Sequence, residues 1–233
     1  TGALTSDSRI FNAVCRQAGI VKVDQPMELL DLAAAFSSLP LPGGARTAFM
    51  TWGGGWGVVT ADLCQLNGLE VPSLDNDVIG RIDELLPSYW SRTNPVDMVG
   101  EQNPQIPMTI LEILMAWEGC DAVINLGILG RRLFMERFGS AVEKADPTIP
   151  RNELNGIRQL LSHFEQDFME HGVRLMGKYK KPVFSISLLS DERQKTVTRY
   201  GNAPYKAVCY ETPERAVNAL SRMVRYKRFL EET

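Results

Sequence analysis

Short apolar runs alternate with helix-like segments along this chain from residue 47 to its end. The runs have the length of strands and are rich in aliphatic residues, as is typical of strands buried on both faces of a sheet. A strand that is joined to the next through a helix is usually parallel to it. The alternation therefore predicts an α/β fold, a doubly wound parallel sheet with helices on both faces. The predicted strands cover 47–51, 121–128, 183–188 and 207–210, with short extended segments at 69–72 and 94–98.

Apolar residues recur at helical spacing in the segments between these strands. Asp75 and Thr212 stand where helices would begin, and both are residue types that cap helix N-termini. The pattern predicts helices over 58–66, 75–86, 107–117, 131–144, 152–178, 191–200 and 212–230. The longest of them has a candidate buried stripe that consists of Leu154, Ile157, Leu160, Leu161, Phe164, Phe168 and Leu175.

Residues 1–42 precede the alternating pattern and contain two helical patterns, at 5–18 and 24–36. The run Pro40-Leu41-Pro42-Gly43-Gly44 follows them. Proline and glycine at this density are typical of a linker. We therefore expect a short helical segment over 1–42 and a main domain over 43–233.

The composition is that of a soluble globular protein, with 44% hydrophobic and 23% charged residues in a chain of 233. The formal net charge of −3 gives no electrostatic reason to expect nucleic acid as a partner. No apolar run reaches the ~18 residues of a membrane span, and the N-terminal residues lack the features of a signal peptide. The four cysteines are scattered, so we expect reduced core cysteines in a cytoplasmic protein without a metal site. His163 and His171 are interpreted as solvated residues on a helix face.

A glycine-rich run separates the first predicted strand from the helix that follows it. It reads Thr51-Trp52-Gly53-Gly54-Gly55-Trp56-Gly57. Such a turn between a strand and a helix directs free backbone N–H groups and the positive end of the helix dipole at an anion. Glycine is expected there because the backbone would take positive φ and let a phosphate approach. The run is neither a P-loop nor a clean dinucleotide fingerprint, so a tight turn that binds nothing is an equal alternative.

Other polar and aromatic residues could complete an anion site. Asp97 could order the glycine-rich turn, contact a ligand or cap its own loop, and the structural roles are favoured. Trp52 and Trp56 could stack on an aromatic ligand or pack against a neighbouring domain. Arg131 and Arg132 could hold a phosphate or remain solvated. The sequence shows no accompanying nucleophile or metal-ligand set, so these residues predict an anion-binding site without catalytic groups of its own.

Five segments carry further motifs, in a fixed order along the chain. They are Thr1-Gly2-Ala3-Leu4, Arg16-Gln17-Ala18-Gly19-Ile20, the run 51–58, Asn94-Pro95-Val96-Asp97 and Thr212-Pro213-Glu214-Arg215-Ala216. Together they resemble the NDP-forming acyl-CoA synthetases, relatives of succinyl-CoA synthetase that include ADP-forming acetate–CoA ligase. In that family the glycine-rich motif reads Thr-Asn-Gly-Gly-Gly-Pro-Gly-Val. The resemblance spans essentially the whole chain.

The resemblance implies that this chain is the C-terminal ligase–CoA domain of such an enzyme. Residues 43–233 would form a flavodoxin-like domain, and 1–42 would be the tail of the preceding histidine-bearing domain plus a linker. The phosphohistidine would lie just before Thr1, which favours a piece of a longer protein that has no catalytic residue of its own and is inactive alone. The helix at the glycine-rich run would stabilise the phosphohistidine. The implied phosphate-binding residues are Gly53, Gly54, Gly55, Trp56, Gly57 and Val58, with Asn94 and Asp97 at the site rim.

In this family the full enzyme interconverts acid, CoA and ATP with acyl-CoA, ADP and phosphate, through an acyl phosphate and the phosphohistidine. The resemblance therefore implies ATP or ADP, Mg²⁺ and CoA for the full enzyme, and no cofactor bound by this chain alone. The implied partners are a CoA-binding domain, the histidine-bearing domain and an ATP-grasp domain or subunit. A homo-oligomer is a further option, and neither nucleic acid nor a membrane is expected.

Two features depart from the family pattern. Trp52 and Trp56 stand where the family has small or proline residues, and they could narrow the phosphate site, tune the acyl substrate or mark a relative that has lost the chemistry. The stretch 131–174, with its long helix, resembles an insertion beyond the family pattern and could form a partner or dimer surface. The alternative function is therefore a non-catalytic scaffold or regulatory module on the same fold. A free-standing protein that binds a mononucleotide is a third hypothesis.

Overall fold

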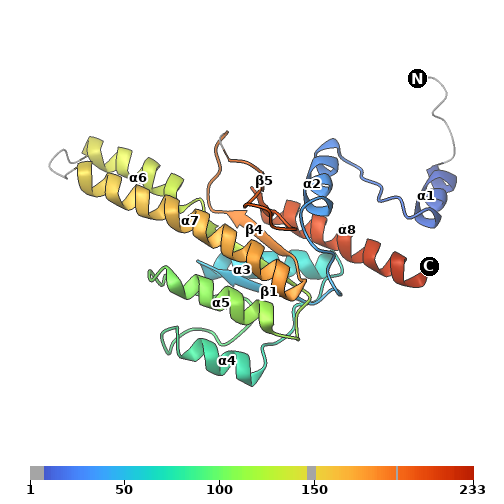
Figure 1. The fold of residues 1–233 in the computed structure, drawn as a ribbon, viewed down its shortest axis with the longest axis horizontal. Coiled ribbons are helices and arrows are strands. Elements are labelled where there is room, and N and C mark those ends of the chain that lie inside the picture. Colours follow the sequence, from blue (N-terminus) through green and yellow to red (C-terminus); the bar gives the residue numbers. More distant parts are fainter. Residues whose placement is uncertain (1–7, 146–150, 193) are drawn as a thin grey trace.

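A sheet of six strands forms the centre of the molecule, in the order β2-β1-β3-β4-β6-β5 (Figure 1). The computed structural model describes residues 8–145, 151–192 and 194–233, so the motif at 1–4 lies outside it. Neighbouring strands are parallel except at one edge, where β5 is antiparallel to β6. The predicted α/β sheet is confirmed, with one antiparallel edge strand. The strands are β1 (Thr47–Thr51), β2 (Val96–Asp97), β3 (Ala122–Leu129), β4 (Val183–Ser187), β5 (Val197–Thr198) and β6 (Ala207–Tyr210).

Helices cover both faces of the sheet, as the sequence predicts. Helices α3 and α8 pack together on one face, with α2 against α8, whereas α5 and α7 pack on the other face (Figure 1). Helices α6 and α7 form a hairpin that projects beyond the sheet. No helix in the described ranges has the length and apolar character needed to cross a membrane. The helices are α1 (Ser8–Gln17), α2 (Pro26–Phe36), α3 (Gly54–Leu66), α4 (Asn76–Asp83), α5 (Gln105–Ala116), α6 (Arg131–Ala145), α7 (Arg151–Tyr179) and α8 (Pro213–Glu232).

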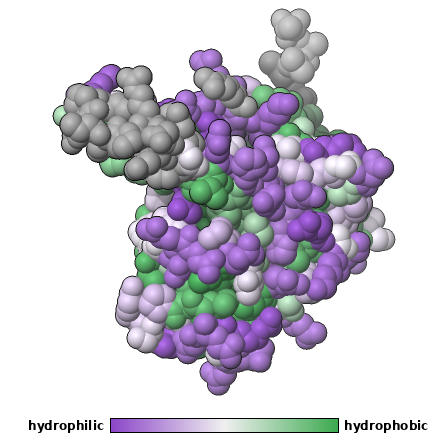
Figure 2. All heavy atoms as spheres, turned by 60° about the vertical axis from the view of Figure 1, so that its left-hand side comes forward, coloured by the Kyte–Doolittle hydropathy of each residue, from purple (hydrophilic) through white to green (hydrophobic). Residues whose placement is uncertain are grey.

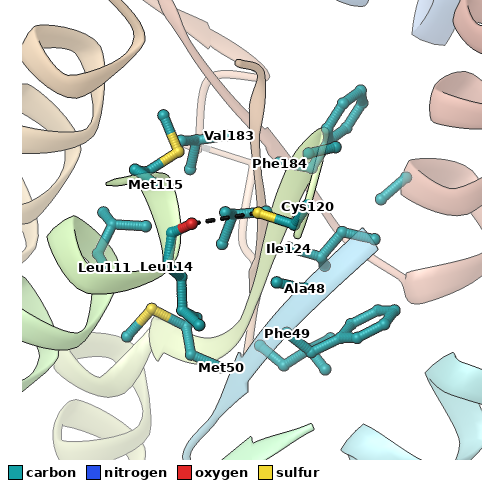
Figure 3. Close-up of a cluster of buried hydrophobic side chains, with 14 of the residues drawn as sticks. Ala48, Phe49, Met50, Leu111, Leu114, Met115, Cys120, Ile124, Val183 and Phe184 are labelled. Atoms are coloured by element: carbon teal, nitrogen blue, oxygen red, sulfur yellow. Dashed lines mark hydrogen bonds between the residues drawn. The ribbon is translucent and has the colours of Figure 1, made fainter. Parts of the chain in front are cut away.

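Strand side chains alternate between the two faces and build the core. In Figure 3, Met50 of β1 points toward Leu111 and Leu114 of α5, while Phe49 points away from that helix. All of these side chains are fully buried. The thiol of Cys120 donates a hydrogen bond of 3.1 Å to the carbonyl of Leu114, which ties the end of α5 to the start of β3 (Figure 3). Every residue of β3 is buried, as expected for a central strand with helices on both sides.

Cys64, Cys120 and Cys209 belong to this core, and Cys15 is buried in α1. All four are free and buried. Burial raises the pKa of the Cys64 thiol to about 12 and that of Cys120 to about 11, because the thiolate would lose its hydration. The prediction of reduced core cysteines is confirmed.

Two predicted elements differ from the structure. The helix predicted at 191–200 is wrong, because its described residues form turns and strand β5. Val197 and Thr198 are β-branched and pair with β6 at the sheet edge, and this pairing outweighs a weak helical pattern. The extended segment at 69–72 is reduced to a single parallel bridge between Arg46 and Glu70.

The long helix is confirmed as α7, and most of its predicted stripe is in place. Phe164, Phe168 and Leu175 are buried. Leu160 is 71% exposed, so its predicted burial is wrong. Leu160 belongs to the first third of α7, and this end of the helix extends past the sheet beside α6 (Figure 1). The stripe residues Leu154 and Ile157 fall outside the side chains that the structure describes.

Helix α2 packs into the main core although it precedes the predicted linker. Leu32 and Ala35 are buried in the same apolar cluster as the sheet residues. Asp31 is buried, and its carboxylate accepts hydrogen bonds from Arg215 of α8, the shortest at 2.7 Å. The Tyr210 hydroxyl donates to the backbone carbonyl of Asp31 at 2.8 Å. The core therefore extends across residues 42 and 43, and the division of the chain there stays a prediction.

Candidate functional site

The glycine-rich run lies where the connections of the sheet change direction. Strand β1 lies between β2 and β3. The chain passes from β1 to β2 on one side of β1, and then from β2 to β3 on the other side of β1. Without edge strand β5 the order is that of flavodoxin-like sheets, whose ligands bind at this point, beyond the carboxyl ends of the strands. A pocket of about 330 Å³ occupies the place here. It is lined by Thr51, Trp52, Gly53, Gly54, Gly55, Trp56, Leu126, Gly127 and Leu188.

The first turn of α3 presents unpaired backbone N–H groups to this pocket. The helix begins at Gly54, four residues before the predicted start at 58, with Gly53 as an N-cap that has no side chain. The Thr51 hydroxyl donates to the Gly53 carbonyl at 2.8 Å and accepts from the Gly53 N–H at 3.2 Å, which fixes the turn. Among the described residues, no acceptor binds the N–H groups of Gly54, Gly55 or Trp56. These are the orphan donors of a helix N-terminus.

The expected positive φ of the glycine-rich run is wrong. Gly53 is extended, with φ of −150°, and none of the other glycines of the run has positive φ. The left-handed glycine of the pocket is instead Gly127, at the end of β3, with φ of +71°. The turn needs no left-handed residue because the run itself forms the N-cap and first turn of the helix.

Close packing explains two of the glycines, and open space surrounds the other two. A Cβ added to Gly54 would lie 2.6 Å from Oδ2 of Asp97, and one added to Gly57 would lie 3.0 Å from Pro95. At Gly53 and Gly55 nothing lies within 4 Å of such a Cβ. Gly53 and Gly55 therefore leave room for a ligand to approach the backbone.

The two rim residues take different places. Asp97 Oδ1 accepts the Val99 N–H at 2.9 Å, and its other oxygen lies against Gly54, so this carboxylate caps its loop and touches the start of α3. Asn94 accepts from the Phe49 N–H at 2.9 Å and donates to the Thr47 carbonyl at 3.0 Å. The Asn94 amide thus extends the hydrogen bonding of β1, and we leave it out of the proposed site.

Val58 also lies away from the free donors. It is in the second turn of α3, where a helical N–H bonds to the carbonyl four residues earlier. Its side chain is 61% exposed. The donors of the candidate site are accordingly Gly54, Gly55 and Trp56.

The two arginines after β3 separate into different environments. The Arg131 guanidinium lies over the Trp52 ring, 3.7 Å from its centroid, and burial lowers the pKa of Arg131. Arg132 forms an ion pair of 3.0 Å with Glu136, and its backbone N–H donates to Glu165 of α7 at 2.8 Å. Burial raises the pKa of Glu165. No local sequence pattern points to Glu165, because its contact with the start of α6 comes from the folding of the hairpin.

The histidines are not part of this pocket. His163 is exposed on α7, as predicted. His171 lies 3.2 Å from the Met108 carbonyl of α5, and its burial lowers its pKa, so the interpretation as a solvated residue is wrong for this one. Over the described part of the chain, no group of three or more His, Cys, Asp or Glu side chains is placed to hold a metal.

Comparison with curated proteins finds ADP-forming acyl-CoA ligases. A 4-hydroxybutyrate–CoA ligase [ADP-forming] of Nitrosopumilus maritimus is 27% identical over 97% of this chain and 28% of its own length. An acetate–CoA ligase [ADP-forming] II of Archaeoglobus fulgidus is 35% identical over 53% of this chain and 19% of its own length. The chain thus spans between about a fifth and about a quarter of these relatives. No family model matches.

Solved structures support the fold. An acetyl-coenzyme A synthetase of Ca. Korarchaeum cryptofilum, in complex with phosphate and ADP, aligns with a TM-score of 0.67 at 19% identity. The alignment covers 99% of this chain and 43% of that one. A Pyrococcus horikoshii protein aligns with a TM-score of 0.66 at 20% identity. The curated homologues and the structural neighbours agree with the resemblance seen in the sequence.

Proposed function

We propose that this chain, a homologue of the ADP-forming acyl-CoA ligases, works as the ligase domain of an NDP-forming acyl-CoA synthetase. The observation that carries the proposal is the similarity over 97% of the chain to a ligase of this type. The full enzyme would convert acid, CoA and ATP to acyl-CoA, ADP and phosphate, and would need Mg²⁺. The domains that bind CoA and ATP would be its partners, in the same polypeptide or in another subunit.

The role of this domain is to hold a phosphoryl group that is carried by a histidine of a partner domain. The N–H groups of Gly54, Gly55 and Trp56 would donate to its oxygens, and the dipole of α3 adds a positive end of about half a charge. Thr51 holds Gly53 in place, so the donors are oriented before the ligand arrives. Donors that need no rearrangement favour developing negative charge in phosphoryl transfer.

A scaffold or regulatory module is the second candidate, and an exposed apolar surface favours it. Phe134 and Phe138 of α6 are 46% and 50% exposed, and their rings stack at 6.1 Å. Leu160 on α7 is also exposed. Figure 2 shows further hydrophobic surface between hydrophilic side chains on the face of the molecule that comes forward in that view. Such a surface on a projecting hairpin suits a protein contact.

One substitution pair tests the catalytic role in the natural protein. Gly55→Pro removes a single N–H donor, and proline is tolerated in the first turn of a helix. Gly55→Ala is the matched control, because it keeps the N–H and its Cβ meets nothing within 4 Å. Mass spectrometry at neutral pH after incubation with ATP and Mg²⁺ measures the rate at which histidine is phosphorylated. We expect Gly55→Pro to be about 100- to 1,000-fold slower than Gly55→Ala, as for removal of one oxyanion-hole donor.

Equal rates for the two variants would contradict the role of this N–H. A natural protein that forms no phosphohistidine would contradict the synthetase proposal and favour the scaffold.

A further inference from the structure

The pocket at the start of α3 continues past the amide donors into apolar walls. Apart from Thr51 and the glycines, its lining consists of Trp52, Trp56, Leu126 and Leu188. No charged side chain in the described residues lines it. A ligand that places an anion at the amides would therefore direct an uncharged, apolar part against the indoles and leucines.

Neighbouring residues hold the Trp52 wall in place. The Arg131 guanidinium stacks on the Trp52 ring at 3.7 Å, a distance that gives a favourable cation–π contact. A Cβ at Gly127 would lie 3.6 Å from the Trp52 Cβ, so the strand that carries Gly127 lies against the base of this side chain. Gly127 has φ of +71°, a conformation that a side chain there would strain. A fixed indole loses little entropy when a ligand packs on it.

The size of the pocket distinguishes small from bulky ligands. Its volume is about 330 Å³. An apolar cavity of ~150 Å³ is enough to hold a benzene molecule. The pocket therefore has space for a phosphate and a ring together, whereas a methyl group would leave most of its apolar surface without contacts.

We propose that this pocket selects the acyl group, and that the substrates are carboxylic acids with a bulky apolar tail, preferably aromatic. The position of the phosphoryl group at the amides rests on the proposed function. The position of the tail rests on the lining of the pocket. The acyl phosphate would place its phosphoryl oxygens at Gly54, Gly55 and Trp56. Its tail would lie between Trp52, Trp56 and the two leucines, where aromatic rings pack favourably. Trp52 and Trp56 are thus the specificity-determining residues.

The affinities of two stable phosphate monoesters distinguish the contribution of the apolar tail from that of the anion. Phenyl phosphate and methyl phosphate have the same charged group and differ in the ring. Isothermal titration calorimetry of the chain measures the affinity of each. We expect phenyl phosphate to bind at least about 10-fold more tightly, and Trp56→Ala and Trp52→Ala each to remove most of this preference while methyl phosphate binding changes little.

Two controls test whether the effects are specific to the pocket and whether the variants fold. Tyr89→Ala removes an aromatic side chain that is 74% exposed and does not line the pocket, and it should leave the preference unchanged. Near-ultraviolet circular dichroism of the buried Trp90 and Trp117 verifies that each variant folds.

The outcomes separate the inference from the proposed function. Equal affinity for the two esters would overturn the acyl pocket and leave the phosphate site standing. A ring preference that survives both tryptophan variants would also overturn it. Failure of both esters to bind would contradict the phosphate site, and the acyl pocket with it.

Discussion

At the residue scale, Gly54 and Gly55 are neighbours in the first turn of α3 and yet face different surroundings. A Cβ at Gly54 would lie 2.6 Å from a carboxylate oxygen of Asp97, and one at Gly55 would meet open space. Asp97 has little freedom to move aside, since its other oxygen binds the Val99 N–H. Packing thus requires glycine at position 54, whereas the space beside Gly55 is available to a ligand.

This contrast predicts opposite effects of the same substitution. Gly54→Ala should lower the free energy of unfolding by about 1–3 kcal/mol, because the methyl group forces Asp97 or the helix to shift. Gly55→Ala should be neutral or stabilising by up to about 1 kcal/mol, because alanine favours the helix. Urea denaturation of both variants measures the difference.

An Asp97→Ala background provides the control. Gly54→Ala should cost less there, since the oxygen that it meets is gone. Equal costs in both backgrounds, or equal effects at Gly54 and Gly55, would contradict the contact.

At the scale of elements, one buried ion pair contributes to the attachment of α2 to α8. Arg215 donates to both carboxylate oxygens of Asp31, from Nε at 3.0 Å and from Nη2 at 2.7 Å. The Asp31 side chain is 5% exposed and that of Arg215 is 24% exposed. Removing one partner of such a pair leaves a buried charge without compensation, which costs far more than the pair contributes as a whole.

We therefore expect Arg215→Met to destabilise the protein by about 3–5 kcal/mol. Hydrogen exchange should show the largest loss of protection in α2, because Asp31 lies in that helix. The double variant Asp31→Leu with Arg215→Met should recover much of the stability, since no charge is then buried. Arg215→Met without an effect on α2 would contradict the role of this pair.

At the scale of the whole molecule, the sequence predicts the architecture better than the details of the site. The alternation of apolar runs with helical segments predicted the sheet with helices on both faces, because burial of strands is visible in local patterns. The glycine-rich run correctly marked the junction of β1 and α3.

Long-range contacts decide what the sequence could not show. The need for glycine at Gly54 and Gly57 depends on Asp97 and Pro95, about 40 residues away in the chain. Arg131, which follows β3, stacks on Trp52, which follows β1. The strand at Val197–Thr198 exists only because β6 lies beside it. Each depends on the tertiary fold, so no local pattern could reveal it.

A titration with inorganic phosphate shows whether the start of α3 binds a phosphoryl group. In ¹⁵N-labelled protein, inorganic phosphate at constant ionic strength should shift the amide resonances of Gly54, Gly55 and Trp56 before all others. A competing anion site would be the basic groove between α1 and α8, which is lined by Arg16, Arg222 and Arg225 among others. Shifts that are confined to that groove, with the three amides of α3 unmoved, would contradict phosphate binding at the start of α3.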